Sequence, residues 1–477
     1  MNLPITTILA FLPELGTSVL VVLLLATLFV KGKAHTFIQW CVPGALLLLM
    51  VAARLIPSGA VNTFAHASFV VDQVTVLGRM LLMLSGAAIV LFALVTKRFP
   101  REFFVLVLLS LLGGLVAIGA QEMLLLYVAI ELLSFPGYIL VAFGKDKRVS
   151  VEAAVKYLLF GVVATAMLLY GFALLIGSCG DTTFSGIAQC VANSPSSESI
   201  LLVPFALILL GLGFKIGTVP AQAWLPDTYT GAPVEVTGFL ASVGKISILL
   251  VLFRLFGVSL LGTFQKGALL IIVLGVTTLV FGTTAALFQK NFRRLLAYSG
   301  IGHVGFMMCL FPLGMVGFQA FSWYLISYIV ATIGIFAYLT FSSLSFDQDS
   351  IEAHQGRIKS NPQLGISVVV LLLSMAGLPP LLGFWGKFGG AVSVMRDYPV
   401  PAGWLLAGAL LVVSVVSFFY YLSVIRQLIS STENSSTQPK KECFSVSLLS
   451  YIAIGAAVFL VVGGIVGEQI LTLFGVG

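Results

Sequence analysis

One lysine lies inside an apolar stretch, shortly before a break in the helix that would carry it. Lys215 follows fourteen residues without a charge, 201–214, and Pro220 comes five residues later. Proline cannot donate the backbone hydrogen bond that a continuing helix needs. An ammonium group near the centre of a bilayer costs about 3 kcal/mol on insertion scales, which makes this lysine a candidate functional residue. The structural alternative is a lysine whose ammonium group snorkels to the membrane surface.

A carboxylate occurs in a similar setting. Glu131 lies in the apolar run AIELLSFPGY, and Pro136 follows it at the same spacing of five residues. A carboxyl group at such a position is either neutral or paired with a cation. Lys156 is open to two interpretations. It belongs to the same group of buried charges, or it forms a local ion pair with Glu152, four residues earlier on a helix.

Three further titratable residues lie in apolar stretches. Lys245 is separated from the nearest acid in sequence, Glu235, by ten residues, or roughly 15 Å of helix, so it needs another partner or a chain of water molecules. Lys387 follows the proline pair at 379–380, which breaks another helix. His303 has a side chain that can titrate near neutral pH, although a single histidine in a helix is more often a hydrogen-bonded structural residue.

These residue types predict proton transfer. Moving a charge toward or away from a buried lysine switches it between holding and releasing a proton. The chain has no CxxC motif, no histidine pair at metal-ligand spacing and no GxGxxG motif after a strand. We therefore expect no metal, iron–sulfur cluster or nucleotide in this chain. The candidate functional residues are Glu131, Lys215, Lys245 and Lys387, with Lys156 and His303 as additional candidates.

The elements that must position these residues are membrane helices. Hydrophobic residues make up 59% of the 477-residue chain and charged residues 9%, and the mean hydropathy is +1.11. This composition excludes a water-soluble globular fold. We expect an all-α polytopic membrane protein, because runs of about 20 apolar residues can cross a bilayer. Fourteen such runs occur, near 8–30, 37–55, 74–96, 103–119, 122–143, 154–177, 200–220, 232–256, 266–288, 295–313, 316–342, 363–395, 402–429 and 445–473.

The two helices broken by proline are the seventh and the twelfth, five spans apart. An odd separation gives them opposite orientations, which predicts two inverted five-helix repeats, an architecture common in transporters. The expected division is three N-terminal helices in 1–102, a first repeat in 103–256, a second, inverted repeat in 266–429 and a C-terminal helix in 445–477. The polar segments 343–362 and 431–444 are expected to be loops, not folded domains.

The distribution of basic residues predicts the topology. Five of the 25 lysines and arginines lie inside expected spans and away from the loops and their flanks: Arg79, Lys156, Lys215, Lys245 and Lys387. Most of the others belong to the odd-numbered loops and their flanks: Lys31, Lys33, Lys97, Arg98, Arg101, Lys145, Lys147, Arg148, Lys290, Arg293, Arg294, Arg357, Lys359, Arg426, Lys440 and Lys441. By the positive-inside rule these loops are cytoplasmic and both termini face the other side. Arg79 is expected to be structural, bonded to an acid or a backbone carbonyl.

Cys179 and Cys190 share the segment 178–199, which has no lysine or arginine and is expected outside. An oxidising compartment would allow them to form a disulfide. Two free thiols are the alternative, because disulfide geometry is strict.

A set of motifs resembles the antiporter-like membrane subunits of the proton-pumping NADH:quinone oxidoreductase (respiratory complex I, or NDH-1), and most closely the subunit-N family. The resemblance covers nearly the whole chain. Lys387 favours subunit N, because the M-like relatives carry a glutamate there. Gln222 and Glu235 depart from the usual pattern, which has histidine and a neutral residue. The motifs are IELLSFP at 130–136, VEAAVKY at 151–157, GLGFKIGTVP and WLPDTYTGAP within 211–233, VGKI at 243–246, QKNFRRLLAYSGIGH at 289–303 and AGLPPLLGFWGKF at 376–388.

The resemblance implies a proton-translocating subunit that holds no cofactor and does no redox chemistry. It also implies that Glu131, Lys215, Lys245 and Lys387 are the key charged residues of a proton path, with Lys156 between the first two. NADH, FMN, iron–sulfur clusters and quinone are then expected elsewhere in the complex. The implied partners are sister antiporter-like subunits and the lipid of a bacterial inner membrane, and no nucleic acid. Three alternatives stay open: a sodium/proton antiporter subunit, a subunit of a hydrogenase-type membrane complex, and a passive scaffold.

Overall fold

We describe the protein from a computed structural model, in which the described residues are 9–29, 34–56, 68–144, 147–193, 198–259, 265–344, 349–430, 444–474 and 476. Several residues used above for topology lie outside these ranges, as does the expected loop at 431–443. Those residues are Lys31, Lys33, Lys145, Lys440 and Lys441.

The first half of the chain is a series of apolar helices. Asp72 caps one of them, α4, where its carboxylate accepts a 2.9 Å hydrogen bond from the Thr75 backbone N–H. The helices are α2 (Leu12–Leu28), α3 (Ala34–Leu55), α4 (Gln73–Thr96), α5 (Arg101–Gly119), α6 (Met123–Val141), α7 (Lys147–Cys179), α8 (Phe184–Asn193), α9 (Glu198–Ile216), α10 (Trp224–Gly231), α11 (Val234–Phe239), the π-helix η3 (Leu240–Gly244), α12 (Lys245–Leu252) and the π-helix η4 (Phe253–Ser259).

The second half has the same character. Asn291 and Asn361 cap α14 and α17 by accepting hydrogen bonds from backbone N–H groups three residues later. The helices are α13 (Gln265–Leu287), α14 (Phe292–Met308), the 3-10 helix η5 (Phe311–Leu313), α15 (Gly314–Ser343), the 3-10 helix η6 (Ile351–His354), α16 (Arg357–Ser360), α17 (Pro362–Ala376), α18 (Leu382–Asp397), α19 (Ala402–Ile429), α20 (Phe444–Ile465) and α21 (Gly467–Leu473).

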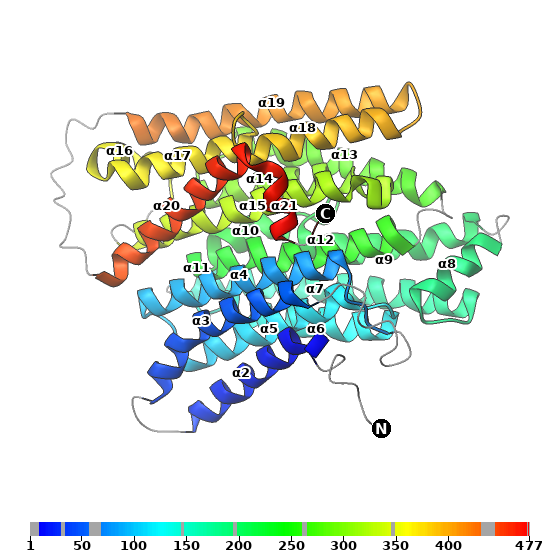
Figure 1. Cartoon of the computed structure of the whole chain (residues 1–477), viewed down its shortest axis with the longest axis horizontal. Coiled ribbons are helices and arrows are strands. Elements are labelled where there is room, and N and C mark those ends of the chain that lie inside the picture. Colours follow the sequence, from blue (N-terminus) through cyan, green and yellow to red (C-terminus); the bar gives the residue numbers. More distant parts are fainter. Residues whose placement is uncertain are drawn as a thin grey trace.

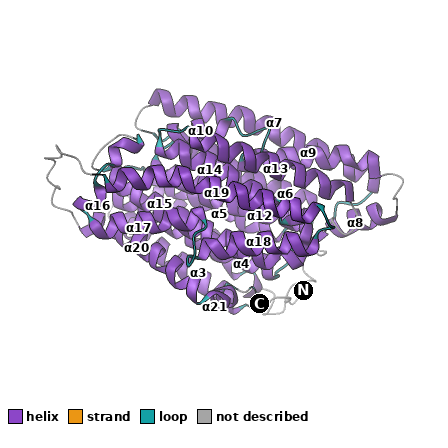
Figure 2. Cartoon of the chain, turned by 90° about the horizontal axis from the view of Figure 1, so that it is seen from above, coloured by secondary structure: helices purple, strands orange, loops and turns teal. Residues whose placement is uncertain are grey.

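The helices lie side by side, and their order in the chain runs across the bundle from α2 and α3 at one edge to α18 and α19 at the other (Figure 1). The red C-terminal helix α20 returns to pack against α15 and α17. α8 and α16 lie at opposite ends of the bundle in both views (Figures 1 and 2). The centre of the bundle is formed by two helical stretches, one containing α11 and α12 and the other α14 and α15. In each stretch, 94% of an apolar segment of 18 residues is buried.

The expected all-α membrane class is confirmed for the residues that the structure describes. Each of the fourteen expected spans contains at least one helix. Ten helical stretches in the described part are long and apolar enough to cross a membrane, and one of them, 292–343, includes both α14 and α15. The number of crossings and the inverted repeats stay predictions. The segment 343–362 contains the short helices η6 and α16, which the sequence reasoning missed.

Both expected helix breaks are present. α9 ends at Ile216 and α10 begins at Trp224, while α17 ends at Ala376 and α18 begins at Leu382. Gly217 and Gly377 follow the two ends with φ of 79° and 87°, which is the left-handed region that glycine adopts without steric cost. Pro136 differs, because α6 continues through it.

Candidate functional site

The first break places Lys215 on the last turn of α9, facing α6. Its Nζ donates a 2.8 Å hydrogen bond to the Ser134 hydroxyl and lies 3.7 Å from Oε1 of Glu131. The same carboxylate oxygen accepts a 2.9 Å hydrogen bond from the Thr165 hydroxyl on α7. The Lys215 side chain is only 5% exposed, so it does not snorkel to the surface. The structure thus brings together the two charges that the sequence singled out first.

Lys156 lies apart from this pair. Its Nζ contacts Oε1 of Glu152 at 2.8 Å, the local ion pair weighed from the sequence, and also Oδ2 of Asp227 on α10 at 3.2 Å. Its side chain is 42% exposed, and Arg294 approaches the same aspartate at 3.6 Å. These contacts join α7, α10 and α14 near the odd-numbered loops. The geometry favours the ion-pair interpretation of Lys156.

A small cavity separates Lys215 from the next lysine along the bundle. Its volume is about 20 Å³, and its lining includes Ser134, Tyr157, Lys215 and Gly244. A polar cavity of about 10–15 Å³ is enough to hold one water molecule. Gly244 ends the π-helix η3, and Lys245 follows it directly. The cavity therefore reaches from one buried lysine to the backbone that carries the next.

Lys245 obtains its partner from aromatic side chains. Its Nζ donates a 3.0 Å hydrogen bond to the Tyr328 hydroxyl and lies over the rings of Tyr328 and Tyr229, 5.5 and 5.9 Å from their centroids. Cations are attracted to the faces of aromatic rings. Gly300 on α14 leaves the space for this ammonium group, because a Cβ atom there would lie 2.2 Å from Nζ. The sequence required a partner but did not identify Tyr328.

His303 lies between two tyrosines. Its Nδ1 is 2.6 Å from the Tyr324 hydroxyl and its Nε2 is 2.9 Å from the Tyr421 hydroxyl. Its ring also contacts Tyr328, with centroids 5.1 Å apart. Both ring nitrogens are hydrogen-bonded, as expected of a structural histidine. The same contacts also place it beside the partner of Lys245.

Lys387 lies at the second break. Its Nζ donates hydrogen bonds to the Ala376 carbonyl oxygen, 3.0 Å away at the end of α17, and to the Ser417 hydroxyl, 3.2 Å away on α19. A cavity of about 10 Å³ adjoins it, and His303 and Tyr324 also line that cavity. The broken helix therefore supplies a carbonyl acceptor to the lysine that follows it.

These contacts arrange the candidate residues other than Lys156 in one row across the bundle. The order is Glu131, Lys215, a cavity, Lys245 with Tyr328, His303, a second cavity and Lys387. Sequence reasoning missed the hydroxyl groups of this row, which come from serines and tyrosines far away in the sequence. No regular spacing in the sequence marks these serines and tyrosines as neighbours of the lysines.

Two buried arginines outside the row form ion pairs that stabilise the fold. Arg79 forms two hydrogen bonds with the Glu14 carboxylate, at 2.8 and 2.9 Å, which confirms its expected structural pairing. Arg254, near the end of the expected span 232–256, is buried and pairs with Asp72 at 2.8 and 2.9 Å. Burial alone would raise the pKa of Asp72, but Arg254 and the Thr75 hydrogen bonds outweigh it and leave the pKa lowered. Both pairs fix α4 against its neighbours.

The whole row falls inside a region shared with known proteins. A sequence model of the family described as "NADH:quinone oxidoreductase/Mrp antiporter, TM" matches residues 120–417. The chain belongs to this family. It is 32% identical to a protein named NADH-quinone oxidoreductase subunit N from Hydrogenovibrio crunogenus, over 99% of both chains. A protein of the same name from Neisseria gonorrhoeae is also 32% identical, over 87% of both chains.

Chains of two solved membrane complexes share the fold. A chain of respiratory complex I from Thermus thermophilus superposes with a TM-score of 0.80 at 29% identity, covering 96% of this chain and 98% of that one. A chain of the Mrp complex from Dietzia superposes with a TM-score of 0.79 at 20% identity, covering 99% of this chain and 96% of that one, and this likeness concerns the fold alone.

Proposed function

We propose that this chain is a proton-translocating membrane subunit of an NADH:quinone oxidoreductase, and that protons move along the row of buried lysines. The observation that carries the proposal is the row itself: Lys215, Lys245 and Lys387 are each buried and each bonded to a hydroxyl group. Relatives named as subunit N of that complex, which match over nearly the full chain, support it.

The mechanism requires each lysine to take up and release a proton. Holding an ammonium in the membrane costs about 3 kcal/mol, and a nearby carboxylate offsets that cost. Glu131, at 3.7 Å, favours the protonated form of Lys215. Movement of this charge pair would release the Lys215 proton toward Lys245 through the intervening cavity. Tyr328, His303 and the second cavity would continue the relay to Lys387.

The chain itself holds no redox centre in this proposal. NADH, FMN, iron–sulfur clusters and quinone belong to other subunits, so electron transfer elsewhere must drive the conformational changes here. The partners are other membrane subunits, including antiporter-like sisters, and the lipid bilayer. The sodium/proton antiporter is the second candidate, because the description of the matching family also names the Mrp antiporter. The two differ in whether transport requires sodium.

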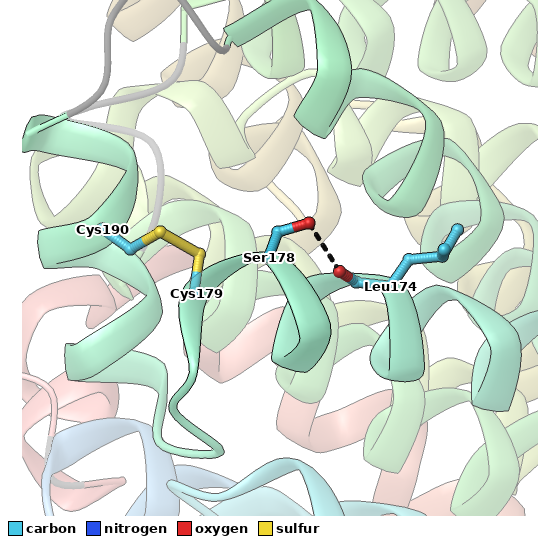
Figure 3. The surroundings of a disulfide bond; sticks show 4 residues. All are labelled: Leu174, Ser178, Cys179 and Cys190. Carbon is cyan, nitrogen blue, oxygen red and sulfur yellow. Dashed lines mark hydrogen bonds between the residues drawn. A yellow bond between two sulfur atoms is a disulfide. The ribbon is translucent and has the colours of Figure 1, made fainter.

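The disulfide supports the proposed location in a bacterial inner membrane. Cys179 at the end of α7 and Cys190 on α8 are joined (Figure 3). Disulfides persist in oxidising compartments, such as the periplasm. α8 would then be periplasmic, and the basic odd-numbered loops cytoplasmic, with both termini on the periplasmic side.

The test combines the subunit composition of the purified complex with a measurement of proton transport. The proteins that co-purify in mild detergent are identified, and proton uptake per NADH oxidised is measured in membrane vesicles. In Glu131→Gln, which keeps the shape but removes the charge beside Lys215, we expect pumping to fall several-fold with normal assembly. Glu102→Gln is the control, because Glu102 is exposed at the start of α5. Normal pumping by Glu131→Gln, or purification without an NADH dehydrogenase and sodium-dependent transport, would contradict the proposal.

A further inference from the structure

A second buried carboxylate lies outside the row of lysines. Glu235, in the first turn of α11, is 1% exposed. The Thr96 hydroxyl and a backbone N–H interact with its carboxyl group, but Oε1 has no hydrogen-bond partner among the described residues. A buried carboxyl oxygen without a partner is costly, and an acid within a membrane segment is usually functional.

The surroundings of Glu235 contain cations that are already engaged elsewhere. The two that act on its carboxyl group are Arg98 and Arg293. Arg98 donates to the Ser343 hydroxyl and carbonyl oxygen, at 3.2 and 2.9 Å. Arg293 donates to the Ala232 carbonyl oxygen and pairs with Asp349 through its terminal nitrogens, while its buried Nε has no partner among the described residues. Within the described residues no cation lies within ion-pair distance of Glu235. The simplest structural explanation, a buried salt bridge, therefore does not apply.

Glu235 lies toward the odd-numbered loops. α11 packs against α4 and α15, and the Arg98–Ser343 contact shows that the ends of α4 and α15 meet beside it. Thr340, in the last turn of α15, has a buried hydroxyl oxygen without a partner in the described part of the chain. Polar atoms of this kind are the positions where buried water binds. Thr340 is therefore a further unpartnered polar group on the side of the odd-numbered loops.

A second unpartnered oxygen lies beside the lysine row, on a residue that is hydrogen-bonded to the helix of Glu235. The Tyr229 hydroxyl is buried and has no partner among the described residues. The ring of Tyr229 lies 5.9 Å from Nζ of Lys245, and its carbonyl oxygen accepts a 3.1 Å hydrogen bond from Thr237, on the same helix as Glu235. Lys245 is about 15 Å along the helix from Glu235. Its side chain leans back toward that end, because helical side chains tilt toward the N-terminus.

We propose that Glu235 is a proton carrier that loads Lys245 from the side of the odd-numbered loops, with the Tyr229 hydroxyl between them. A proton from water on that side binds Oε1 of the Glu235 carboxylate. The resulting carboxylic acid passes it on through water to the Tyr229 oxygen, which gives its own proton to the neutral Lys245 amine. Glu235 returns to the carboxylate and Tyr229 to the neutral phenol, and the net result is one proton taken from the water on that side and bound to the Lys245 amine. This proposal rests on the function proposed above.

The test uses the assembled complex in membrane vesicles, with proton uptake per NADH oxidised as the readout. We expect Glu235→Gln to lower pumping about tenfold or more, since a positioned proton carrier contributes about 10²–10⁴-fold. Tyr229→Phe, which keeps the ring and removes the hydroxyl, should lower it in the same direction. Glu235→Asp keeps a titratable group and should recover much of the activity, which a shape-sensitive structural residue would not do. Glu102→Gln serves again as the control.

Three outcomes separate this proposal from the one before it. If Lys245→Met pumps normally, the lysine row is wrong. If Lys245→Met fails to pump while Glu235→Gln and Tyr229→Phe pump normally, only the role of Glu235 is overturned. A failure of Tyr229→Phe to assemble would also overturn it, because a hydroxyl without a partner contributes no hydrogen bond to the fold.

Discussion

The most decisive perturbation is Lys215→Arg, because it separates a fixed positive charge from a titratable one. Nζ of Lys215 lies 3.7 Å from Glu131 and 2.8 Å from the Ser134 hydroxyl, beside a cavity of about 20 Å³. Arginine adds two heavy atoms to the side chain, beside a cavity that has room for about one water molecule. Its guanidinium group keeps its proton in proteins, since its pKa stays above about 12.

The magnitudes follow from this geometry. Two unit charges about 4 Å apart attract each other by about 4 kcal/mol at an effective dielectric constant of about 20. Arginine keeps that attraction to Glu131, so we expect the amount of assembled complex to stay within about twofold of normal. If Lys215 must release its proton, the permanent charge blocks the relay. We then expect pumping to fall more than tenfold, or more than about 1.4 kcal/mol in the barrier.

A second substitution checks the stability side of this reasoning. Lys215→Met removes the cation and leaves Glu131 with its Thr165 hydrogen bond alone. Removing one member of a buried ion pair costs about 3–5 kcal/mol. The Glu131 side chain is 18% exposed, so we expect the lower end of that range. The double variant Lys215→Met with Glu131→Gln should assemble better than Lys215→Met and still not pump.

The measurements are proton uptake per NADH oxidised in membrane vesicles and the yield of intact complex on a native gel. Full pumping by Lys215→Arg would refute the relay role and leave Lys215 a structural cation. Loss of assembly in Lys215→Arg alone would show that the space at this position, not its charge, limits the substitution.

Two further predictions concern other parts of the bundle. Gly300→Ala should lower pumping several-fold, because the new Cβ would lie 2.2 Å from Nζ of Lys245 and displace it, whereas Gly44→Ala has open space around it and is the control. Burial, and secondarily the Arg357 charge, lowers the pKa of His354 from 6.5 to about 3. Below pH 6.5, His354 therefore binds a proton in the unfolded segment but stays neutral in the folded one. The stability of the folded segment falls as the pH falls toward 3. The opening free energy of 351–354, from hydrogen exchange corrected for intrinsic rates, should drop by about 2 kcal/mol between pH 7 and pH 5, and His354→Leu should remove this dependence.

The sequence by itself determined the membrane class, the helices and their two breaks. These properties are local: a run of apolar residues must form its hydrogen bonds within a helix when no water is present, and proline removes a donor wherever it occurs. Lys215, Lys245 and Lys387 could be singled out for the same reason, since the cost of a charge in an apolar run can be read from its neighbours in the chain. The family motifs around them then indicated proton transport.

Only the tertiary structure decided which groups these charges meet. Lys245 depends on Tyr328, 83 residues away, and Lys215 on Ser134, 81 residues away. The burial of Arg254 against Asp72 and the unpartnered oxygen of Glu235 were equally hidden. A hydrogen bond requires two atoms within about 3 Å, and in a helical bundle that proximity is set by how separate helices pack. The sequence of one helix shows a charge within an apolar stretch. The partner of that charge depends on how the neighbouring helices pack against it.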